Sequence, residues 1–100
     1  MAINNQLIIP AAAHADANSR EVIRAWVVDG GLHVSLFIPD GWHDPGNWGI
    51  ALCDVARHLA DAYRQQYGSD PQKTLQRIHD AFLAEFSSPT DSPSGGFVDE

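Results

Sequence analysis

Histidines and carboxylates that could do chemistry lie around the longest predicted helix. His43 and Asp44 are adjacent just before it, and a carboxylate beside an imidazole can orient a general base or a metal ligand. Asp44 also precedes Pro45, in the arrangement of a helix cap followed by a proline in the first turn. This cap would occupy the carboxylate, and we therefore interpret His43 as a loop residue.

A second candidate group combines His58 and Asp54 on one surface of the same helix with His33 from a predicted strand. Imidazole and carboxylate groups are ligands for zinc and related metals. A metal site needs about three such ligands, and the sequence lacks the HxxxH, HxH and Glu-xx-His spacings. A metal-binding or minor enzymatic protein that uses His33, His43, His58 and Asp54 is therefore the alternative hypothesis, and we predict no catalytic residue, metal site or cofactor.

Cys53 is the one cysteine, so the chain can form no internal disulfide, which suits a reducing compartment. Its place within the helix predicts a semi-buried small residue, because the dipole that activates a thiolate fades beyond the first turn. The sequence has no GxSxG motif, P-loop or dinucleotide-binding turn. These observations weigh against catalytic activity.

Charge and length bound the possible partners and location. The chain has 100 residues, enough for one domain, with six Lys and Arg, thirteen Asp and Glu and a formal net charge of −7. Scattered basic residues argue against binding to nucleic acid or to an anionic membrane. The apolar run Leu7–Ile9 is too short for a signal peptide, and no stretch approaches the ~18 apolar residues of a spanning helix. We therefore expect a cytoplasmic protein.

Residues 21–38 predict a β-hairpin, because β-branched runs flank the turn sequence Asp29-Gly30-Gly31. A rival interpretation is a helix that starts at Asn18. Either two-residue loop, 29–30 or 30–31, places only apolar side chains on one face of the hairpin. This aliphatic face consists of Ile23, Ala25, Val27, Leu32, Val34, Leu36 and Ile38.

The opposite hairpin face carries Trp26, Val28 and Phe37, too much apolar surface to leave wet on a small monomer. A lone hairpin is also barely stable and has two open edges. We expect the N-terminal arm, the C-terminal tail or a second copy of the protein to cover this face or to extend the sheet.

Two helices should follow the hairpin. Apolar residues recur at helical spacing from Trp48 to Tyr67 and mark a stripe for the sheet. Gly68 then predicts a helix end, and Asp70-Pro71 starts a second helix. The predicted fold is therefore α+β: a hairpin packed on an antiparallel helical pair, in the order β-β-α-α, with its sheet extended or covered by dimerisation. The predicted domain spans 20–86, between an arm (1–19) and a Ser/Pro/Gly-rich acidic tail (87–100).

Aromatic and charged residues predict the interaction surface. Tryptophan is favoured at the centre of protein interfaces, and the charged side of the first helix is left free by its apolar stripe. The predicted interface residues are Trp26, Phe37, Trp42, Arg57 and His58. We expect a homodimer that also binds a further, unidentified protein, as an interaction or regulatory module.

Several motifs resemble one bacterial family. They are REVIRAW, GLHVSL, W-x-DP-x-x-WG-x-x-L-x-D-x-ARH-x-A-x-AY and SPTD-x-P-x-GGF, and they span nearly the whole chain. Together they are similar to domain of unknown function 5076, a family of small single-domain proteins without assigned activity. The resemblance implies no catalytic residues and favours a non-enzymatic role.

Overall fold

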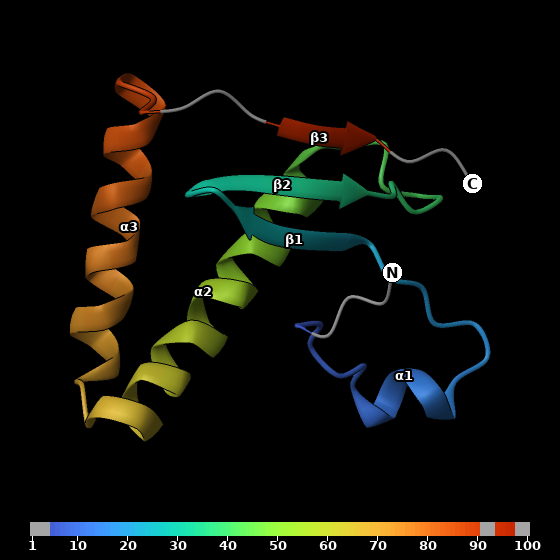
Figure 1. The fold of residues 1–100 in the computed structure, drawn as a ribbon, viewed down its shortest axis with the longest axis horizontal. Coiled ribbons are helices and arrows are strands. Elements are labelled where there is room, and N and C mark those ends of the chain that lie inside the picture. The colour runs from blue at the N-terminus through green and yellow to red at the C-terminus, as the bar shows by residue number, and fades with distance from the viewer. Residues whose placement is uncertain (1–4, 91–93, 98–100) are drawn as a thin grey trace.

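The computed structural model describes residues 5–90 and 94–97, and its elements confirm the predicted order β-β-α-α (Figure 1). The fold is α+β, with an antiparallel hairpin followed by two packed helices. A short helix precedes the hairpin, and a third strand follows the helical pair. The elements are α1 (Ala11–Ala15), β1 (Ile23–Val28), β2 (Gly31–Leu36), α2 (Gly46–Tyr67), α3 (Pro71–Ser87) and β3 (Ser94–Phe97).

The hairpin has the two-residue loop Asp29-Gly30. Asp29 (φ 51°) and Gly30 (φ 80°) both have positive φ, as a type I′ turn requires. The register confirms the predicted aliphatic face, since its members lie opposite one another. The pairs are Ile23 with Leu36, Ala25 with Val34, and Val27 with Leu32.

The C-terminal tail extends the sheet. β3 pairs in parallel with β2, which gives the strand order β1-β2-β3 and leaves β1 at one edge. A parallel neighbour needs a long crossover connection, and α2 and α3 provide it. Of the alternatives left open for the tail, 94–97 therefore adopt an extended strand; residues 91–93 and 98–100 lie outside the described part of the chain.

The ends of both long helices follow from local sequence. Asp44 accepts a hydrogen bond from the Gly46 N–H (2.9 Å), so its carboxylate binds the first N–H of α2. Pro45 directly precedes the helix, and Asp44 lies one residue before Pro45. Gly68 ends α2 in the left-handed conformation. Asp70 then caps α3 by accepting a hydrogen bond from the Gln72 N–H (3.0 Å), and Pro71 is the first helical residue.

The two long helices pack on each other. Ala60 is 4% exposed and is the one buried residue in the described part of the chain. On α3, Leu75 and Ile78 are half-buried. The two helices form a V in Figure 1, and no Cα of either helix lies within 8 Å of a strand Cα among the described elements.

The chain is open for its size. Its accessible surface is 8670 Å², whereas a compact monomer of 10.9 kDa exposes about 5,600 Å². The radius of gyration is 15.5 Å, against about 13 Å for a compact domain of 100 residues. In the described residues, no helix is both long and apolar enough to cross a membrane.

Candidate interaction surface

The aliphatic face of the sheet is largely exposed. Val27 is 75% exposed and Leu32 56% exposed, and Ile23 and Ile38 are exposed as well. Val34 and Leu36 are half-buried. The face that the sequence assigns to the core is therefore apolar and accessible in the single chain, because the helical pair stands away from the strands.

The apolar stripe of the helices is exposed too. The exposed members of the stripe are Leu52, Val55, Leu59, Tyr63 and Tyr67 in α2, and Phe82, Leu83 and Phe86 in α3. The aromatic members form two ring pairs: Tyr63 with Tyr67, tilted at 5.6 Å between ring centroids, and Phe82 with Phe86, edge to face at 4.9 Å. In the described part of one chain, the sheet and the helices thus each carry an apolar surface that is largely exposed.

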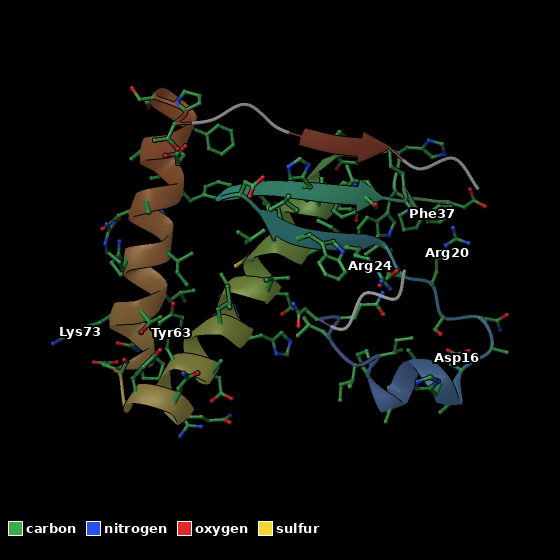
Figure 2. All side chains as sticks on the ribbon, viewed as in Figure 1. Asp16, Arg20, Arg24, Phe37, Tyr63 and Lys73 are labelled. Atoms are coloured by element: carbon green, nitrogen blue, oxygen red, sulfur yellow. The ribbon has the colours of Figure 1, made fainter. Side chains whose placement is uncertain are left out.

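The opposite sheet face is better covered. The Arg20 guanidinium lies 3.7 Å from the centre of the Phe37 ring, a cation–π contact at one end of the sheet (Figure 2). Arg24 forms an ion pair with Glu21 (3.1 Å). Trp26 is half-buried and lines a groove of about 710 Å³ between β1 and the N-terminal arm. Of the predicted interface residues, Phe37 and Trp26 therefore lie on a partly covered face.

The arm itself stays accessible. Leu7 is 95% and Ile8 92% exposed. Within the single chain, the Leu7 and Ile8 side chains therefore make little contact with the other described residues. The arm therefore adds to the exposed apolar surface of the single chain.

Trp42 lies at the junction of sheet and helix. It is half-buried, and its ring meets that of Trp48 edge to face, with 5.1 Å between centroids. The contact explains two tryptophans that flank one helix start. The contact also buries part of the Trp42 ring within the chain, and the rest of the ring stays accessible.

The charged side of α2 carries Asp54, Arg57, His58 and Asp61, all exposed. Asp61 accepts hydrogen bonds from Arg64 (2.8 Å) and Gln65 (2.6 Å). The Arg64 hydrogen bond, and then that of Gln65, hold the pKa of the Asp61 carboxyl below its ordinary value. This surface is a solvated face that contains the predicted interface residues Arg57 and His58.

The predicted metal ligands do not assemble. His33 belongs to β2, His43 to the loop before α2, and Asp54 and His58 to the middle of α2. The described residues contain no group of three or more His, Cys, Asp or Glu side chains that could hold a metal. Cys53 is exposed in the single chain, where we expected a semi-buried residue. The reason is that α2 and α3 diverge from their shared turn, and Cys53 lies toward the far end of α2 (Figure 1).

One polar cluster was missed from the sequence. On α3, the Nδ1 of His79 lies 3.1 Å from an Asp80 oxygen, which also accepts a hydrogen bond from Gln76 (2.8 Å). The contact with His79, followed by that with Gln76, lowers the pKa of Asp80. The adjacent residues His79 and Asp80 were the feature of the sequence that could have predicted this cluster. Both side chains are exposed and lack a third ligand, so the cluster stabilises the surface of the helix.

These features describe a small α+β domain whose described residues offer apolar contact surfaces and no group of side chains that could hold a metal. The matching family model, a domain of unknown function (DUF5076), covers residues 6–90. The chain belongs to this family, as its central motifs indicated. No curated protein matches the chain.

A solved structure is similar over nearly the whole chain. It comes from the photosynthetic bacterium Rhodopseudomonas palustrus and is described as a candidate pyruvate dehydrogenase. The two chains are 36% identical, the TM-score is 0.70, and the match covers 92% of this chain and 93% of the other. The fold described here is therefore shared by a related protein of nearly equal length.

Proposed function

We propose that this protein is a homodimeric protein-interaction or regulatory module without catalytic activity. The observation that carries the proposal is the exposure of two apolar surfaces in one chain, the aliphatic face of the sheet and the stripe along α2 and α3. A second copy can cover both at once, because each copy brings the same two surfaces to the contact.

The amount of surface supports this proposal. The single chain exposes roughly 3,100 Å² more than a compact monomer of its mass. If each copy covered half of this excess in a dimer, the interface would bury about 3,000 Å² in total, which is within the range of obligate homodimers.

Other residues contribute around this contact. Trp26 and Phe37 lie on the opposite sheet face, and Trp42 lies at the start of α2, so we place them at the margin of the interface. Arg57 and His58 point to the charged side of α2, where they stay available to an unidentified protein partner. The absence of an assembled metal group in the described residues gives the metal-binding alternative no added support.

The mass in solution tests the proposal. Light scattering and sedimentation at micromolar concentration should give about twice 10.9 kDa. Val27→Glu places a charge on the aliphatic face and should shift the protein to the monomer, since an unpaired buried charge is costly. Val27→Thr is the matched control, because it keeps the β-branched shape without the charge. A mass of 10.9 kDa for the unaltered protein across this range would refute the proposed dimer.

The related bacterial structure raises pyruvate dehydrogenase activity as a second candidate. Oxidative decarboxylation of a 2-oxo acid needs an electron sink such as a thiamine-type cofactor. Holding its diphosphate calls for a loop of backbone N–H groups or converging cations, and the sequence offers no such loop. An assay with pyruvate, thiamine diphosphate and an electron acceptor tests this candidate directly. We expect no turnover above the rate without protein.

A further inference from the structure

The free edge of β1 is a row of unpaired backbone groups. The Phe37 N–H donates to the Val22 carbonyl (2.9 Å), and hydrogen-bonded pairs alternate along an antiparallel ladder. Arg24 and Trp26 therefore bond to β2, whereas the N–H and C=O groups of Ile23, Ala25 and Val27 face away from it. Among the described residues these six groups have no hydrogen-bond partner.

This edge lacks the usual protection against strand pairing. Natural edges are blunted by charged side chains, proline, bulges or short strands. β1 has six residues with one charge, Arg24, and its register with β2 is unbroken. The other edge of the sheet, β3, is four residues long and contains two glycines. β1 is accordingly the better template for an added strand.

We infer that β1 pairs with β1 of a second copy in antiparallel orientation, so that two sheets become one across a two-fold axis. This inference rests on the proposed homodimer and specifies how it is built. A two-fold axis perpendicular to the sheet keeps the aliphatic faces of both copies on the same side. The dimer would then present one continuous apolar surface to the four long helices.

The chemistry of the strand selects the register. The outward-facing groups belong to Ile23, Ala25 and Val27, so each of these residues must lie opposite one of the same three in the second copy. This requires the two-fold axis to pass between the two copies of one residue. An axis at Ala25 pairs the whole segment 22–28 with itself, including Ile23 with Val27 of the second copy. It also sets Arg24 opposite Trp26 of the second copy on one face, where a cation–π contact is favourable. An axis at Arg24 would instead oppose two like charges.

The position of the arm leaves room for this strand. The groove of about 710 Å³ is lined by arm residues 5–10 and by residues 23–26 of β1, among others, so it runs along part of the segment that would pair. The exposed Leu7 and Ile8 lie on its arm side. A strand from the second copy would occupy the groove and give these side chains an apolar neighbour.

Cysteine cross-linking tests the register. In a Cys53→Ser background, Ala25→Cys places two thiols opposite each other at the axis, about 5.5 Å apart between Cα atoms, within the range of a disulfide. Val27→Cys is the matched control on the same face, with its two copies about 14 Å apart along the strands. Mild oxidation should link most of the Ala25→Cys protein and little of the Val27→Cys protein.

The outcomes separate this inference from the proposed function. A dimeric mass with no Ala25→Cys link, or with equal links in both variants, would overturn the β1 pairing and leave the dimer standing. A monomeric mass for the unaltered protein would overturn both. Removal of residues 1–9 tests the arm as the rival occupant: we expect the dimer and its Ala25→Cys link to persist at the same yield, and a link that forms only after the removal would assign the edge of the intact chain to the arm.

A backbone substitution gives an independent readout. Ala25→Pro removes one outward N–H and no bond to β2, and proline is tolerated at strand edges. Its circular dichroism should match that of Ala25→Thr, while its mass falls to about half. A dimeric Ala25→Pro protein would contradict the inference.

Discussion

Trp42 and Trp48 contact each other edge to face, at 5.1 Å between ring centroids and an interplanar angle of 81°. The two residues bracket the start of α2, since Trp42 closes a turn with Pro39 and Trp48 lies in the first helical turn. Gly41 has a φ of 90° within this turn, which favours glycine. The aromatic contact therefore fixes the direction in which the chain leaves the sheet and enters the helix.

Trp42→Ala should lower the free energy of unfolding by about 1–3 kcal/mol, since it removes both the ring contact and the half-buried surface of Trp42. Urea unfolding followed by circular dichroism, at one fixed protein concentration, measures the change. Trp42→Phe is the control: a ring at this position should restore part of the loss. Equal stability of the Ala variant and the unaltered protein would show that the contact is incidental.

Two glycines of α2 allow a matched comparison of backbone conformation. Gly49 lies inside the helix, and Gly68 ends it with a φ of 70°. An added Cβ meets nothing within 4 Å at either position. Gly49→Ala should therefore stabilise the protein by about 0.5–1 kcal/mol, whereas Gly68→Ala should destabilise it by about 1–2 kcal/mol through the left-handed backbone. Thermal unfolding of both variants checks the opposite signs, and the same sign for both would contradict the argument.

Local signals predicted much of the fold. The sequence Asp29-Gly30-Gly31 predicted a two-residue loop and hence which side chains share a face, while the structure selects 29–30 and with it the register. Gly68 and Asp70 specified the helix ends, because each acts over two to four residues. β3 was missed as an element since two of its four residues are glycines, with low strand propensity, and its pairing with β2 is distant in sequence. The apolar stripe of the helices is a different kind of signal. It shows which side chains need to be buried, but it does not show which surface buries them. Its members are exposed in the single chain, and the sequence could not reveal this.

The carboxyl of Asp61 should titrate at low pH. The Arg64 hydrogen bond and that of Gln65 place its pKa below the ordinary 3.8. Because the folded-state pKa is depressed, the stabilising contribution is present above the unfolded pKa and is lost as the pH falls through the folded one. NMR titration of the carboxyl carbons should show Arg64→Gln raising this pKa toward 3.8.

Asp80 provides the internal control in the same titration. Its pKa is lowered by His79 and Gln76 on α3, so Arg64→Gln should leave it unchanged. A shift of both carboxyls would point to a change of the whole fold, and a shift of neither would mean that the Arg64 contact is not maintained in solution.

Removal of residues 91–100 should expose one side of β2 and leave the other paired. β3 covers residues 33–36 of β2. Since His33 and Ser35 bond to β1 in the alternating ladder, the amides of Val34 and Leu36 are the ones that face β3. Loss of β3 should speed hydrogen exchange at these two amides by on the order of tenfold, the effect of losing one backbone hydrogen bond. His33 and Ser35 serve as controls within the same strand. Uniform acceleration along β2 would mean that the tail stabilises the hairpin as a whole, and unchanged exchange would refute the β2–β3 pairing.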